Sequence, residues 1–143
     1  MKKILLASTS TLFGQGYLEY LLEELESFFE GCSTITFIPY ARPGGISHDA
    51  YTALAATAFS KINKKVVGLH TFTDPLKGLA QAEAIFTGGG NTFLLVQQLQ
   101  QMQLINPLKE KIESGTPYLG TSAGSNIAGP SMKTTNDMPI VHP

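Results

Sequence analysis

A serine between two glycines is the residue of this chain best placed for nucleophilic chemistry. The sequence GTSAG at residues 120–124 fits the pattern G-x-S-x-G and follows a short apolar run. In this pattern the serine occupies a tight turn between a strand and a helix, where flanking glycines avoid steric clashes. We therefore predict that Ser122 is a nucleophile and that the backbone N–H of Ala123 faces the developing oxyanion. The alternative is a strand-to-helix turn in which Ser122 is only an N-cap.

Three consecutive glycines form a second loop that could take part in the same chemistry. Residues 88–90 follow an apolar run and precede Asn91. Glycines let the backbone approach a ligand closely and expose its N–H groups. We expect the N–H of Gly90 to be a second oxyanion donor, and Gly89 and Asn91 to contact substrate. A phosphate site at a helix N-terminus, or simply a flexible loop, is the alternative. The glycines do not fit G-x-G-x-x-G and no Walker lysine follows, which disfavours nucleotide binding.

Both loops require a sheet that places them at one edge. Short apolar runs alternate with segments of helical periodicity, which predicts a doubly wound α/β fold with a parallel sheet covered on both faces. Ligands of such sheets bind beyond the carboxyl ends of the strands. The expected strands are 4–7, 35–38, 66–69, 84–87 and 118–120. The expected helices are 18–28, 50–62, 75–82, 92–104, one capped by Asn106 and Pro107, and a short one after Ser122.

Composition limits the kinds of partner. The 143 residues suit one domain, residues 1–143. A net charge of −1 and a single arginine, Arg42, argue against nucleic acid or an acidic membrane as partner. Cys32 is the only cysteine, which excludes an internal disulfide and a thiolate metal site. We expect no cofactor, no metal and a cytoplasmic location. Arg42 follows the second expected strand and could bind an anionic substrate group, although an exposed surface arginine is the alternative.

Three blocks of the sequence resemble a known family. FTGGGNT at 86–92, GTSAGSN at 120–126 and TTNDMPIV at 134–141 look like successive signature blocks of dipeptidase E, an aspartyl dipeptidase family of serine peptidases. The resemblance implies metal-free hydrolysis of dipeptides with an N-terminal aspartate through an acyl-enzyme on Ser122. It also implies that Asp137 is the acidic residue of the charge relay, with a carboxylate from later in the chain as the alternative.

The same resemblance bears on the fold. It implies a flavodoxin-like sheet similar to that of class I glutamine amidotransferases. Two other functions stay open on the sequence alone. One is amide hydrolysis of the cyanophycinase type. The other is a catalytically inactive α/β module that binds a small ligand or a partner chain.

The general base is the missing component of this scheme. The three histidines are His48, His70 and His142, and none occupies the family's base position downstream of the third block. Structural roles are the simpler expectation for each of them. We therefore expect residues 1–143 to be the N-terminal, nucleophile-bearing part of a longer family domain, truncated at the C-terminus. A chain of this kind is expected to have low activity alone and to self-associate through an exposed sheet edge.

Overall fold

The computed structural model describes residues 3–7, 18, 21–42, 46–121 and 140–141. The strands are β1 (Ile4–Ala7), β2 (Thr34–Ile38), β3 (Lys65–Gly68), β4 (Ile85–Thr87), β5 (Tyr118–Thr121) and β6 (Ile140–Val141). The α-helices are α1 (Leu22–Phe28), α2 (His48–Ser60), α3 (Pro75–Ala80), α4 (Thr92–Gln101) and α5 (Ile105–Glu113). A short 3-10 helix, η2 (Leu69–Thr71), follows β3. No helix in these ranges has the length and apolar character needed to cross a membrane.

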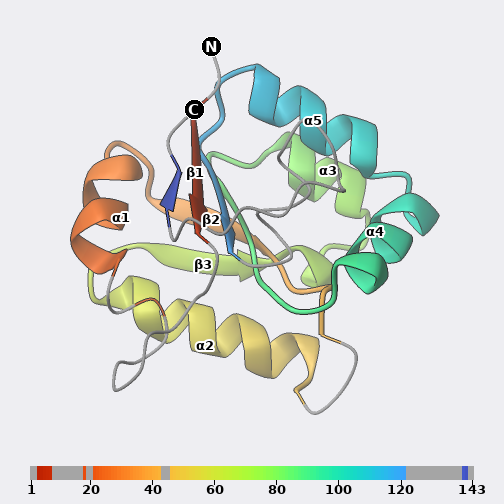
Figure 1. Cartoon of the computed structure of the whole chain (residues 1–143), viewed down its shortest axis with the longest axis horizontal. Coiled ribbons are helices and arrows are strands. Elements are labelled where there is room, and N and C mark those ends of the chain that lie inside the picture. Colours follow the sequence, from red (N-terminus) through yellow and green to blue (C-terminus); the bar gives the residue numbers. More distant parts are fainter. Residues whose placement is uncertain (1–2, 8–17, 19–20, 43–45, 122–139, 142–143) are drawn as a thin grey trace.

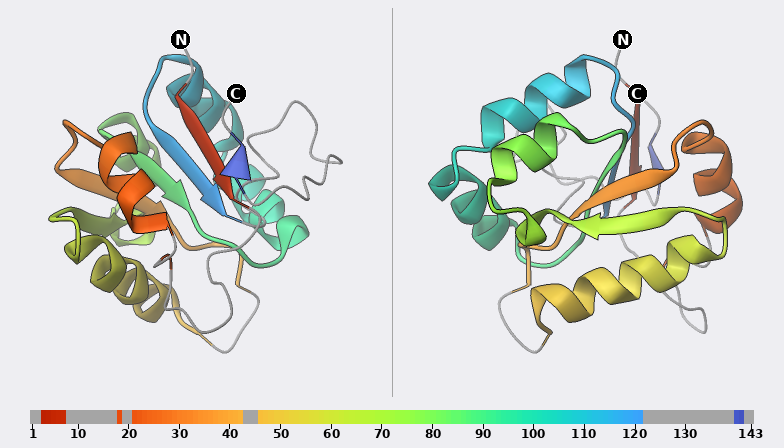
Figure 2. Two further views of the ribbon diagram at one scale, coloured as in Figure 1. Left: turned by 60° about the vertical axis from the view of Figure 1, so that its left-hand side comes forward. Right: turned by 180° about the vertical axis from the view of Figure 1, so that it is seen from behind.

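The strands form one sheet in the order β3-β2-β4-β5-β1-β6. β1 to β5 are parallel, as predicted, and β6 pairs antiparallel with β1 (Figure 2, left). The flavodoxin-like order is 2-1-3-4-5. The first five strands of this sheet match it when β2 is counted as strand 1, β3 as 2, β4 as 3, β5 as 4 and β1 as 5. The predicted doubly wound α/β class is therefore confirmed, whereas β6 was not predicted.

Helices cover both faces of the sheet (Figure 1). One apolar cluster joins the sheet to α1 and α2, and the other joins it to α3, α4 and α5. Successive strand residues alternate between the two clusters: Ile85 belongs to the cluster on the side of α3, α4 and α5, and Phe86 to the cluster on the side of α1 and α2. Because β4 and β5 are buried on both sides, their sequences are largely apolar runs, which is the pattern that predicted them, whereas the edge strand β3 is only partly buried.

Two helix starts differ from the sequence-based expectation. The first helix was expected from Leu18, but that residue has φ of 59°, which a right-handed helix cannot contain, and α1 begins at Leu22. The cap predicted at Asn106 is wrong, since α5 begins at Ile105 after Leu104. Pro107 is then the third helical residue, where its missing N–H would have had no intrahelical partner.

Of two other helices, α3 starts as predicted and α2 starts within two residues of the prediction. Asp74 accepts a hydrogen bond from the N–H of Leu76 (3.1 Å), with Pro75 as the first residue of α3. α2 begins at His48, two residues before the expected start, and the Ser47 hydroxyl oxygen accepts from the N–H of Ala50 (3.0 Å). The short helix predicted after Ser122 lies outside the described residues.

Candidate active site

The carboxyl ends of β2, β4 and β5 lie side by side. Ile38 is paired with Thr87 across β2 and β4, and Thr87 is paired with Gly120 across β4 and β5. The segment after β2, the glycine loop after β4 and the chain leaving β5 at Thr121 therefore depart from the same edge. Ser122 is the next residue along the chain. Ser122, Ala123 and Asp137 themselves lie outside the described residues.

The glycine loop is held tightly against the segment that leaves β2. The N–H of Gly88 donates to the carbonyl of Ile38 (3.2 Å), which prolongs the pairing of β4 with β2. The N–H of Asn91 donates to the carbonyl of Ala41 (2.7 Å). Gly90 has φ of +147°, and a Cβ on it would lie 2.3 Å from the same Ala41 oxygen. Both its backbone conformation and the close approach therefore require glycine at position 90.

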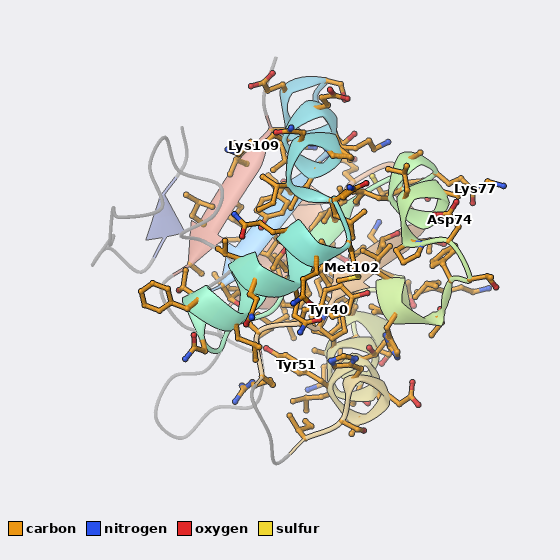
Figure 3. All side chains as sticks on the ribbon, turned by 90° about the vertical axis from the view of Figure 1, so that its right-hand side faces the viewer. Tyr40, Tyr51, Asp74, Lys77, Met102 and Lys109 are labelled. Atoms are coloured by element: carbon orange, nitrogen blue, oxygen red, sulfur yellow. The ribbon has the colours of Figure 1, made fainter. Side chains whose placement is uncertain are left out.

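Tyr51 of α2 contacts this loop from the other side. Its hydroxyl donates to the carbonyl of Gly89 at 3.0 Å, and its side chain is buried, with its ring edge-on to Phe37. A Cβ on Gly88 would lie 2.5 Å from the Tyr51 hydroxyl oxygen. This role of Tyr51 was not predicted, because Tyr51 and Gly89 are 38 positions apart and nothing in either local pattern joins them. The Tyr51 side chain is labelled between α4 and α2 in Figure 3.

Arg42 lies at the outer rim of the same group. The central carbon of its guanidinium is 4.9 Å from the centre of the Tyr51 ring, a cation–π arrangement. Arg42 is exposed, so its N–H groups can reach an anionic ligand at this edge. The structure thus brings Arg42 together with the glycine loop through Tyr51.

Asn91 has a definite structural task. Its side-chain oxygen accepts the N–H of Leu94 (3.0 Å) and caps α4, which begins directly after the glycine loop. Four or so N–H groups at such a helix start lack intrahelical partners, and their partial positive charge favours anions. The predicted contact of Asn91 with substrate stays a prediction, since its oxygen is already used by the helix.

Two histidines form a separate cluster beside this edge. His70 Nε2 lies 2.6 Å from a carboxylate oxygen of Asp49, and the rings of His48 and His70 are 5.4 Å apart. The His48 ring also meets that of Tyr40, at 5.3 Å. Burial, then the charge of His70, lowers the pKa of His48, while Asp49 opposes the shift. In the described ranges, no three His, Cys, Asp or Glu side chains form a group that could hold a metal ion.

Comparison with known proteins identifies the family of this chain. The model of peptidase family S51 matches residues 4–143. The chain is 44% identical to "Probable alpha-aspartyl dipeptidase" of Drosophila melanogaster, over 99% of this chain and 59% of that protein. It is 44% identical to Peptidase E of Streptomyces coelicolor, over 98% of this chain and 56% of the relative, and 43% identical to Peptidase E of Haemophilus influenzae, over 100% and 66%.

Solved structures agree with these matches. A crystal structure of a protein assigned as a peptidase E from Listeria monocytogenes EGD-e superposes with a TM-score of 0.69 at 28% identity, over 92% of this chain and 64% of that one. A peptidase from an acI-B1 Actinobacterium shares the fold at a TM-score of 0.68 and 21% identity, over 87% and 55%. The chain spans a little more than half the length of the first two curated relatives. On the family match over residues 4–143, the chain belongs to peptidase family S51.

Proposed function

We propose that the protein carrying this sequence is a serine peptidase that hydrolyses dipeptides with an N-terminal aspartate. The family membership supports hydrolysis of a peptide bond, and the names of the relatives, alpha-aspartyl dipeptidase and peptidase E, support the substrate. The observation that carries the proposal is the pairing of β4 with β5 at Thr87 and Gly120. It makes the glycine loop and the chain leading to Ser122 leave the sheet from neighbouring strands.

The proposed reaction is an acyl transfer in two steps. The Ser122 hydroxyl attacks the scissile carbonyl and gives its proton to a general base, which Asp137 orients. Backbone N–H groups of Gly90 and Ala123 stabilise the oxyanion of the tetrahedral intermediate. The amine of the second residue leaves with the proton, and water then hydrolyses the aspartyl ester. Residues 1–143 are proposed to be the nucleophile-bearing part of the family domain, which places the base histidine elsewhere in the working enzyme.

Arg42 is the proposed partner of the substrate's anionic side chain. Its guanidinium is exposed beside the glycine loop and offers N–H donors in the fork geometry that suits a carboxylate. Stacking on Tyr51 restricts the rotamers of the arginine before substrate arrives, which reduces the entropy lost on binding. Gly89 and Asn91 are proposed to line the same subsite.

A substrate panel with a covalent probe tests the proposal. Asp-Leu, Asn-Leu and β-aspartyl-arginine are offered to the whole wild-type protein that carries this sequence and to its Ser122→Ala variant, and a fluorophosphonate probe is applied to both. We expect hydrolysis of Asp-Leu and labelling by wild type alone. Hydrolysis of β-aspartyl-arginine without Asp-Leu would instead support the amide hydrolase of cyanophycinase type. Wild-type protein that folds, binds Asp-Leu and hydrolyses none of the three would support an inactive binding module.

Location and self-association are also proposals. We propose a cytoplasmic location, for which the single cysteine of the sequence is the supporting observation. Self-association is proposed to use an exposed edge of the sheet. Sedimentation of the wild-type protein would test it: a monomeric protein would contradict self-association.

A further inference from the structure

We infer that Tyr51 is a positioning residue that aims the N–H of Gly90 at the oxyanion, and that Arg42 holds Tyr51 in place for this task. The inference rests on the proposed function, because it assigns a role within the same acyl-transfer site. It concerns a contact between α2 and the glycine loop that the signature blocks do not include.

The geometry of one peptide unit links Tyr51 to the N–H of Gly90. The carbonyl of Gly89 and the N–H of Gly90 belong to the same planar trans peptide, so they point in opposite directions. The Tyr51 hydroxyl binds that carbonyl oxygen at 3.0 Å, in the buried side of the loop. Fixing the oxygen on Tyr51 therefore fixes the N–H on the side away from Tyr51, and Gly90 itself is exposed.

The glycine loop needs a restraint on its central peptide. A glycine peptide rotates readily because glycine populates positive and negative φ almost equally. Two contacts already hold the flanks, namely the N–H of Gly88 on Ile38 and the N–H of Asn91 on Ala41. Between them, the hydrogen bond from the Tyr51 side chain holds the carbonyl of Gly89, which belongs to the central peptide of the loop.

The surroundings of Tyr51 restrict the movement of its side chain. Its side chain is 1% exposed, packs edge-on against Phe37 at 4.9 Å and lies under the Arg42 guanidinium. The buried ring has little freedom to leave the loop, and a hydrogen bond in such surroundings is stronger than one in water. An anionic group bound by Arg42 and the oxyanion donor of Gly90 are thus connected through one side chain.

Tyr51→Phe tests this role because it removes one oxygen and keeps the ring. Loss of an oxyanion donor lowers kcat by about 100- to 1,000-fold. A donor that is present but misaligned should cost less, so we expect kcat for Asp-Leu to fall about 10-fold, with KM within about twofold. The matched control is Tyr40→Phe, which removes a hydroxyl from a buried tyrosine at the same edge whose ring meets His48. We expect kcat of this control within about twofold of wild type.

A structural readout keeps the inference separate from the proposed function. In ¹⁵N-labelled protein, residual dipolar couplings report the direction of the Gly90 N–H whether or not the enzyme turns over. We expect the Gly90 coupling to change in Tyr51→Phe, with couplings in α4 and β4 unchanged, and to stay as in wild type in Tyr40→Phe. If wild type shows no Ser122-dependent hydrolysis, the proposed function fails and the coupling alone decides the role of Tyr51.

Two results would overturn the inference. One is an unchanged Gly90 coupling in Tyr51→Phe. The other is an equal fall of kcat in Tyr51→Phe and Tyr40→Phe, since that would show a general effect of losing a buried hydroxyl. If Tyr51→Phe does not fold, the H/D isotope shift of the Gly89 carbonyl ¹³C resonance in wild type replaces it: a detectable shift supports the bond from Tyr51, and none contradicts it.

Discussion

Replacement of Gly90 by alanine should destabilise the protein for two separable reasons. The first is backbone strain, because φ of +147° is unfavourable for residues with a Cβ and such strain is of order 1–3 kcal/mol. The second is steric, because the new Cβ would lie 2.3 Å from the Ala41 carbonyl oxygen and must displace it. That oxygen accepts the N–H of Asn91 at 2.7 Å, a bond worth about 1 kcal/mol. Together we expect Gly90→Ala to lower the free energy of unfolding by about 2–4 kcal/mol.

Gly31→Ala is the matched control for the strain alone. Gly31 also has a positive φ, +88°, but nothing lies within 4 Å of the position of its Cβ. We expect a loss of about 1–2 kcal/mol there. Urea unfolding followed by circular dichroism measures both variants, since the chain has no tryptophan to serve as a fluorescence probe. For a chain of this length, 1 kcal/mol corresponds to a Tm change of about 3 °C. A loss for Gly90→Ala no larger than that for Gly31→Ala would refute the close approach of the loop to Ala41.

Two further predictions concern charge. Arg42→Gln removes the cation but keeps a polar side chain, so KM for Asp-Leu should rise about 10-fold. The KM for Asn-Leu, measured alongside, should stay within about twofold. Equal changes in KM for both substrates would contradict recognition of the aspartate carboxylate. Burial and the neighbouring His70 hold the pKa of His48 below its ordinary 6.5, so the unfolded chain binds this proton more readily than the folded chain. The contribution of His48 to the free energy of unfolding is then complete above about pH 6.5 and falls as the pH drops through that value. In urea unfolding, His48→Gln should make this fall shallower. Parallel pH profiles of the free energy of unfolding for the two proteins would contradict the lowered pKa.

The central strands could be predicted from the sequence because they are buried on both faces. Ile85 and Phe86 pack toward opposite layers of helices, so the strand is an unbroken apolar run that needs no knowledge of its neighbours. The cap at Asp74 was likewise local, since the side chain binds an N–H two residues away. Leu18 shows the limit of this approach: its helical spacing is real, yet it lies in the core with a positive φ, outside α1.

The surroundings of the candidate site depended on contacts that no local pattern records. Tyr51 has the spacing of an ordinary core residue of α2, and only the packing of α2 against the sheet brings its hydroxyl to Gly89. Asp49 and His70 are 21 positions apart and meet because η2 directs His70 back toward the start of α2. The glycines at 88–90 were predicted to let the backbone approach a ligand, whereas the close approach that the structure shows at Gly90 is to the carbonyl oxygen of Ala41.

The central claim is that Ser122 forms an acyl-enzyme with aspartyl dipeptides. Release of leucine from Asp-Leu, measured for wild type and for Ser122→Ala under identical conditions, tests it most directly. The account predicts that wild type hydrolyses Asp-Leu and that the variant, folded to the same extent by circular dichroism, loses at least about 1,000-fold in kcat. Hydrolysis by Ser122→Ala within a few-fold of wild type would contradict it, because the nucleophile would then be another group.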